Sequence, residues 1–319
     1  MAGDEADGVL DLMVEQLRVE SDGVLSVVLV DPAGGLLPVW APGAHIDLGV
    51  PHGDPGMIVR QYSLCGDPAD RFRYTVAVLR EPASRGGSGY VHEVLRPGDL
   101  VEVGGPRNHF TLAPAGRYRF IAGGIGITPI LPMLAEAEAR GVPWTLTYGG
   151  RRRASMAFLD RLTAYGDRIS VVPQDERGHP DLAALLGTPE PGTAVYCCGP
   201  AGLLDAVQAA CGAWPAGAVH LERFMPKSVD TGPDRAFDVV CARSGGQFTV
   251  APGQSILDRL ETLGVDVPNA CRTGVCGSCE TKILDGAPEH RDSVLAPDAD
   301  ATLMVCVSRS ATDRLVLDL

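Results

Sequence analysis

The sequence contains few aromatic residues, fewer cationic than anionic residues, and no long apolar run. Phe, Trp and Tyr make up 5% of the 319 residues, which argues against a base-stacking platform for nucleic acid. There are 27 Lys and Arg against 40 Asp and Glu, and the net charge of −13 argues against nucleic-acid and anionic-lipid surfaces. No stretch of about 18 uncharged apolar residues occurs, so we expect no membrane-spanning helix.

The first 20 residues, MAGDEADGVLDLMVEQLRVE, lack the basic start and apolar centre of a secretory signal. We therefore expect a cytoplasmic protein. In that reducing compartment the nine cysteines are metal or cofactor ligands, or buried free thiols, rather than disulfides. A length of 319 residues predicts two or three domains.

Three regions differ in their hydrophobic pattern. Residues 9–112 read as short β-branched strands bounded by Gly, Pro and Asp, with a helical stretch at GYVHEVL, and predict a β-sandwich or barrel. Residues 113–226 alternate strand and helix, including a helix at SMAFLDRLTAYG, and predict a doubly wound parallel α/β sheet. Residues 227–234 read as a linker, and residues 235–319 begin with a hairpin and a short helix.

The C-terminal region carries four cysteines in the spacing C-x4-C-x2-C and then a long gap: Cys271, Cys276, Cys279 and Cys306. Thiolates are the ligands that iron–sulfur clusters prefer, and this spacing is typical of plant-type [2Fe–2S] sites. Gly274 and Gly277 let the loop curl around a cluster without a Cβ in the way. We therefore predict that these four residues are metal ligands.

Zinc is the alternative for this quartet. Structural zinc sites pair their cysteines in two short hooks, whereas Cys306 is solitary, with no histidine near it in the sequence. The pattern therefore favours the iron–sulfur cluster. The five other cysteines are interpreted as small apolar side chains of the core: Cys65, Cys197, Cys198, Cys211 and Cys241.

The segment RQYSLCGDP resembles the R-x-Y-S motif of the ferredoxin–NAD(P) reductase superfamily. A guanidinium can fork onto a phosphate, a tyrosine ring can lie against a flavin, and a serine can hydrogen-bond near the flavin N5. Downstream, glycines before a predicted helix start suit a second contact with a phosphate, although an ordinary capped loop would look the same. The candidate flavin-binding residues are Arg60, Gln61, Tyr62, Ser63, Arg85, Gly86, Gly87 and Ser88.

Two further turns follow predicted strands, FIAGGIGITPI and VYCCGPAGLL. Turns at the carboxyl ends of parallel strands form the crevice where open α/β sheets bind ligands, although generic strand–helix loops share this pattern. The candidate nucleotide-binding residues are Gly123, Gly124, Gly126, Thr128, Cys198, Gly199 and Pro200.

Six motifs occur in the order seen in the phthalate dioxygenase reductase family, and the chain resembles that family over residues 9–319. The resemblance implies an N-terminal antiparallel β-barrel that binds FMN, a central NAD-binding α/β domain and a C-terminal β-grasp-like ferredoxin domain. It implies FMN rather than FAD because the ferredoxin domain comes last. It also implies that Glu222 and Phe224, in HLERF, close the flavin site.

The implied activity is a reductase that passes a hydride from NADH to FMN, and then single electrons through a [2Fe–2S] cluster to a terminal Rieske oxygenase or haem monooxygenase. No acid–base catalytic residue is needed. The arginines at 151–153 leave NADPH open as the donor. A redox sensor without turnover is the alternative from another class. The family also implies a monomer.

Overall fold

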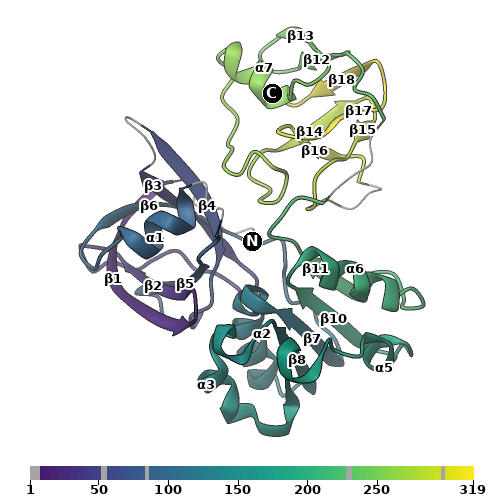
Figure 1. Cartoon of the computed structure of the whole chain (residues 1–319). Helices are drawn as coiled ribbons and strands as arrows, with labels where there is room; N and C mark the ends of the chain where they lie inside the picture. Colours follow the sequence, from purple (N-terminus) through teal and green to yellow (C-terminus); the bar gives the residue numbers. More distant parts are fainter. Residues whose placement is uncertain (1–7, 52–55, 83–85, 228–231, 296–298) are drawn as a thin grey trace. The chain divides into compact units, whose positions relative to one another are not determined.

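The computed structural model describes residues 8–51, 56–82, 86–227, 232–295 and 299–319. The chain divides into two units, Met1–Glu222 and Arg223–Leu319, and each has a hydrophobic core of its own (Figure 1). No helix among the described residues is long and apolar enough to span a membrane.

The first unit begins with a six-stranded antiparallel sheet in the order β4-β3-β6-β1-β2-β5. A bridge between Leu64 and Val76 links its two edges, so the sheet closes into the expected barrel. One helix packs on it through Val91, which lies in the barrel core. The elements are β1 (Leu10–Ser21), β2 (Val24–Val30), β3 (His45–Pro51), β4 (Met57–Ser63), β5 (Arg73–Leu79), α1 (Gly87–Glu93) and β6 (Leu100–Arg107).

A five-stranded parallel sheet follows in the order β11-β10-β7-β8-β9. Its strands are β7 (Arg117–Gly123), β8 (Trp144–Gly150), β9 (Ile169–Pro173), β10 (Thr193–Cys198) and β11 (Val219–Glu222). Its α-helices are α2 (Ile127–Ala139), α3 (Leu159–Leu162), α4 (Gln174–Arg177), α5 (Leu182–Leu186) and α6 (Ala201–Ala210); 3₁₀ turns are η1 (Gly124–Gly126), η2 (Arg153–Ser155) and η3 (Thr163–Arg168).

Helices cover both faces of this parallel sheet. Figure 1 shows α2 and α6 beside the sheet. Ile130 of α2 belongs to one core with Phe120, whereas Val207 of α6 belongs to another with Ile121. The doubly wound fold is therefore confirmed. The strand order reverses between β7 and β10, so the ligand-binding crevice of such sheets is expected at the carboxyl ends of these two strands.

One predicted helix is much shorter than expected. The helix at SMAFLDRLTAYG reduces to the four residues of α3, followed by a 3₁₀ turn. Phe158 adopts a left-handed conformation (φ 63°) and Gly166 a positive φ of 57°, so the helix cannot extend past either residue. Phe158 is buried, and packing of its ring in the core stabilises this unusual backbone.

The second unit is a mixed sheet in the order β13-β12-β18-β14-β16, with β12 and β18 parallel and the other pairs antiparallel. Ser255 caps its helix in a capping box with Asp258, and Leu260 packs into the core. The elements are β12 (Phe237–Cys241), β13 (Gln247–Val250), α7 (Ile256–Thr262), β14 (Glu280–Asp285), β15 (Pro288–Glu289), β16 (Thr302–Met304), β17 (Arg309–Ser310) and β18 (Arg314–Leu317). This arrangement confirms the ferredoxin-type fold.

Candidate functional site

The fold brings the four C-terminal cysteines together. Hydrogen bonds between the thiols connect Cys271 with Cys276 and Cys306, and Cys279 with Cys306. These bonds hold the pKa of Cys271 far below its usual value and raise the pKa values of Cys276 and Cys306 well above theirs. Three of the four side chains are buried, and Cys271 is half-buried. A long loop and one distant strand end thus form a single sulfur-lined site.

The loop that carries three of these cysteines needs an unusual backbone. Arg272, Gly274 and Gly277 all have a positive φ, at 55°, 71° and 75°. The guanidinium of Arg272 is ion-paired with Glu261 of α7. The backbone N–H of Thr273 donates to the sulfur of Cys271 (3.3 Å), as N–H groups around a cluster commonly do.

Among the described residues, no three His, Cys, Asp or Glu side chains converge as ligands of one metal ion would. A [2Fe–2S] cluster does not need three ligands that converge on one ion. Its four cysteines are shared between two irons, which bridging sulfides connect. The donor set of four thiols, at the plant-type spacing and wrapped by a positive-φ loop, fits this cluster.

Arg60, on β4, and the glycines that begin α1 lie against each other. A Cβ on Gly87 would fall 2.6 Å from Cγ and 3.1 Å from Nε of Arg60, so only glycine allows this approach. Gly86 has a positive φ of 110°, and the hydroxyl of Ser88 accepts from the backbone N–H of Glu81 (3.1 Å). Arg85, which we also expected at this site, lies outside the described residues.

The other motif residues on β4 are held by the barrel. Gln61 pairs with Asp47 of β3 and donates to its carboxylate (2.6 Å), which is also ion-paired with Arg107 of β6. Ser63 is buried, and burial raises the pKa of the Tyr62 phenol to about 12, which keeps it neutral. The structure therefore shows Gln61 as a cross-strand anchor of the motif.

The glycine turns after β7 and β10 meet at the switch point. A Cβ on Gly126 would lie 2.3 Å from the carbonyl oxygen of Cys198, and one on Gly199 would lie 3.0 Å from Cα of Gly123. Gly124, in contrast, has open space beside it. This close approach of two backbones forms a cradle at the carboxyl end of the sheet.

Two other candidates of the nucleotide site, Thr128 and Pro200, stand where α2 and α6 begin, and Phe224 was predicted for the flavin site. Thr128 is buried in the first turn of α2 and donates to the carbonyl of Ile125 (2.9 Å), and Pro200 precedes α6. Phe224 follows β11 and is exposed. Thr128 and Pro200 therefore shape the helix starts that border the cradle.

Cys198 and Glu222 pair across neighbouring strands at the edge of this cradle. They are partners in the parallel register of β10 and β11, and their side chains share a hydrogen bond. The Oε2 atom of Glu222 is buried without a partner, and burial raises the pKa of this carboxyl to about 8. Burial and the neighbouring Glu222 also raise the pKa of the Cys198 thiol well above its usual value. Cys198 is thus more than an apolar side chain of the core.

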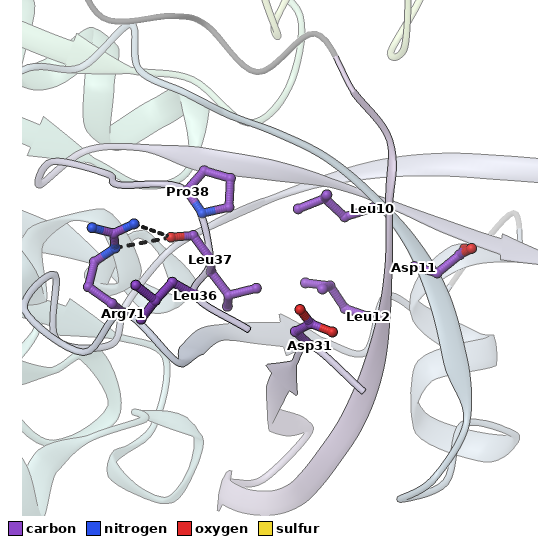
Figure 2. A pocket seen from close by; sticks show the side chains of 8 residues that line it. All are labelled: Leu10, Asp11, Leu12, Asp31, Leu36, Leu37, Pro38 and Arg71. Atoms are coloured by element: carbon purple, nitrogen blue, oxygen red, sulfur yellow. Dashed lines mark hydrogen bonds between the residues drawn. The ribbon is translucent and has the colours of Figure 1, made fainter. Parts of the chain in front are cut away.

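A separate pocket lies on the barrel, lined by residues such as Leu10, Leu36 and Asp31 (Figure 2). Arg71 points at the carbonyl of Leu37 and donates to it twice, at 3.0 and 2.7 Å. None of the predicted site residues lines this pocket. The cradle and the thiol loop, not this pocket, therefore carry the predicted chemistry.

Several residues that support the candidate sites were not found from sequence. Asp47 and Arg107 anchor the flavin motif, and Asp292 and Ser308 contact the thiol region. Each acts through partners distant in the chain, so no local spacing marks it.

The chain is similar to known proteins in both sequence and structure. Residues 239–311 match the family described as "2Fe-2S iron-sulfur cluster binding domain". The chain is 45% identical over 316 residues to the phenoxybenzoate dioxygenase subunit beta of Ectopseudomonas oleovorans, covering 97% of each chain. It is 38% identical to the solved phthalate dioxygenase reductase, covering 98% of each chain with a TM-score of 0.70.

A second solved structure extends the comparison to a haem enzyme. An intact type IV self-sufficient cytochrome P450 monooxygenase is 43% identical to this chain, with a TM-score of 0.91. The match covers 98% of this chain and 41% of that one.

Proposed function

Because this chain belongs to the phthalate dioxygenase reductase family of oxygenase reductases, we propose that it oxidises NADH, with FMN as its flavin, for a terminal oxygenase. Like its relatives, it carries electrons from NAD(P)H through a flavin and a [2Fe–2S] cluster to an oxygenase. The observation that carries this conclusion is the site of four thiols, three from one loop and the fourth from Cys306. The same chain contains a barrel with the R-x-Y-S motif and a glycine cradle.

Residues on β4 and at the start of α1 would hold the flavin. The contact between Arg60 and Gly87 brings the arginine side chain to the glycines that begin α1, where it would suit a phosphate. Tyr62 and Ser63 would lie along the ring system. α1 has only seven residues, so the charge of Arg60, not the helix dipole, would supply most of the attraction. FMN rather than FAD rests on the position of the ferredoxin domain after the other two.

The cradle between β7 and β10 would receive the nicotinamide nucleotide. Its glycines let the ligand approach the backbone, and the partly exposed Glu222 with its orphaned Oε2 would face the nicotinamide side of the cradle. Cys198 donates to Glu222 and so fixes the orientation of that carboxyl. These residues bind and orient; none of them needs to transfer a proton.

The loops after β8 and β9 favour NADH over NADPH. Arg153 donates twice to the carboxylate of Glu176, at 3.0 and 2.7 Å, so its guanidinium fork is already occupied. Asp175 adds a second carboxylate beside this pair. A 2′-phosphate would have to displace Glu176 and approach two negative charges, whereas a 2′-hydroxyl would not.

The bound flavin and cluster would supply the conversion of a two-electron donor into single electrons for the acceptor. Cys271, Cys276, Cys279 and Cys306 would hold the cluster. We propose residues 9–112 as the flavin domain, 113–226 as the nucleotide domain, 227–234 as a linker that lies partly outside the described residues, and 235–319 as the ferredoxin domain. The acceptor would be a Rieske oxygenase or a haem monooxygenase.

An anaerobic absorption spectrum of the purified holoprotein, before and after NADH, tests this function. We expect flavin and iron–sulfur bands that both bleach within one turnover, and FMN on acid release of the flavin. Rapid NADH-dependent reduction of a dye would exclude the redox-sensor alternative. Colourless protein, or bands that NADH leaves unchanged, would contradict the proposal.

A further inference from the structure

Asp292 is a buried carboxylate that the proposed function does not yet use. Its side chain is fully buried, in the segment that follows β15. One oxygen accepts from the backbone N–H groups of Val294 (3.0 Å) and Leu295 (2.7 Å). The other accepts from the hydroxyl of Ser308 (3.1 Å), with the imidazole of His290 at 3.4 Å. A carboxylate with several donors at one buried point stabilises the conformation of the chain around it.

Asp292 contacts both parts of the thiol site. Ser308 lies two residues after Cys306 and is fully buried, so its bond to Asp292 anchors the segment of the fourth cysteine. Gly274 lies within the loop of the other three cysteines. A Cβ there would fall 3.0 Å from Cα and 3.1 Å from Cβ of Asp292, and the N–H of Ser293 donates to the Gly274 carbonyl (2.8 Å).

The hydrogen bonds of Asp292 come from dipoles rather than from a guanidinium. The neighbouring Arg291 instead contacts Glu289 (2.7 Å) and Asp234 (2.8 Å). The charge of Arg291 is therefore shared between two other carboxylates, and the buried carboxyl group of Asp292 lies beside the thiol loop with the imidazole of His290 as its ionisable neighbour. A negative charge opposes the arrival of an electron nearby, and more strongly where water is excluded.

We propose that Asp292 is a positioning residue for the iron–sulfur site and that its charge lowers the reduction potential of the cluster. It holds the three-cysteine loop and the Cys306 segment in register, so that four thiols meet the cluster together. This inference rests on the proposed function for the presence of the cluster. It adds a residue that touches no ligand sulfur but sets how tightly and at what potential the cluster is held.

Two substitutions separate position from charge. Asp292→Asn keeps the size and most hydrogen bonds but removes the charge, so we expect normal iron content and a reduction potential shifted upward in a spectroscopic redox titration. Asp292→Ala removes both the hydrogen bonds and the charge, so we expect several-fold faster loss of iron to a chelator. The matched control is Asp285→Asn, which changes an exposed carboxylate on β14 and should move neither quantity.

An Asp292→Asn potential equal to that of the control overturns the charge effect, and normal iron retention in Asp292→Ala overturns the positioning effect. If Asp292→Ala does not fold, Ser308→Ala replaces it, because it deletes only one contact of Asp292. We then expect an intermediate rate of iron loss to the chelator. Iron retention is measured without turnover. Failure of NADH to reduce the wild-type flavin would therefore count against the proposed function and not against Asp292.

Discussion

At the residue scale, Glu222 sits where burial opposes its charge. Its carboxyl pKa of about 8 in the native protein lies above the ordinary 4.5, so the native state binds the proton more tightly than the unfolded state does. Its contribution to stability is therefore fully present below about pH 4.5 and is lost as the pH rises through 8. Above that pH the native state carries a carboxylate whose Oε2 atom is buried without a partner.

Glu222→Gln should remove this pH dependence. We expect the variant to match the wild type near pH 5 and to gain roughly 1–3 kcal/mol of unfolding free energy by pH 9, because each pKa unit is worth about 1.4 kcal/mol and partial exposure reduces the sum. Thermal unfolding followed across this range measures the difference. Glu102→Gln, at an exposed position on β6, is the control and should show no widening gap. A constant difference at all pH values would argue against a buried Glu222.

At the element scale, the segments after β8 and β9 bear on the proposed preference for NADH. The loop after β8 supplies Arg153, and the segment after β9 supplies Glu176. Neither loop alone predicts the preference, because arginines at this position leave NADPH open as the donor. The contact between Arg153 and Glu176 supports the proposed preference for NADH.

Glu176→Gln should free the Arg153 fork and remove one repulsive charge. We expect kcat/KM with NADPH to rise about tenfold, equivalent to about 1.4 kcal/mol, with little change for NADH. Steady-state dye reduction with both donors measures it. Glu136→Gln, which breaks a similar surface ion pair between Glu136 of α2 and Arg140 just after that helix, is the matched control. An unchanged ratio of kcat/KM for NADPH to kcat/KM for NADH would show that Arg153 does not discriminate at the ribose 2′ position.

The element boundaries also show which helices and strands could be predicted from sequence patterns and which could not. The strand–turn–helix units at β7 and β10 were predictable because apolar strands and glycine turns are local features. The helix at SMAFLDRLTAYG was not, because Phe158 leaves the helical region when its ring enters the core. A tertiary contact here overrides local helix propensity.

At the scale of the whole molecule, the excess of acidic residues bears on which kind of acceptor protein the chain would bind. Residues 233–319 contain 13 Asp and Glu against 8 Lys and Arg, within a chain of net charge −13. A mildly negative ferredoxin unit would attract a basic partner and release it easily, as transient electron transfer requires.

Salt should therefore slow electron delivery to a basic protein more than to a small neutral acceptor. With cytochrome c as the basic acceptor, we expect the rate to fall several-fold between low salt and about 0.3 M, where the Debye length is only a few ångströms. Reduction of a neutral quinone, measured in the same buffers, should change less than about twofold. Equal sensitivity of both rates would rule out acidic docking.

The sequence alone determined the class of reaction and, through its resemblance to the family, the use of a flavin, a pyridine nucleotide and a [2Fe–2S] cluster. Thiol spacing, the R-x-Y-S motif and the glycine turns are local patterns, and their order along the chain identified the family. Only the tertiary structure decided which side chains support them. Arg60 meets Gly87, Cys198 meets Glu222, and Asp292 meets both parts of the thiol site. These pairings depend on strand register and on packing between distant segments, which no single stretch of sequence encodes.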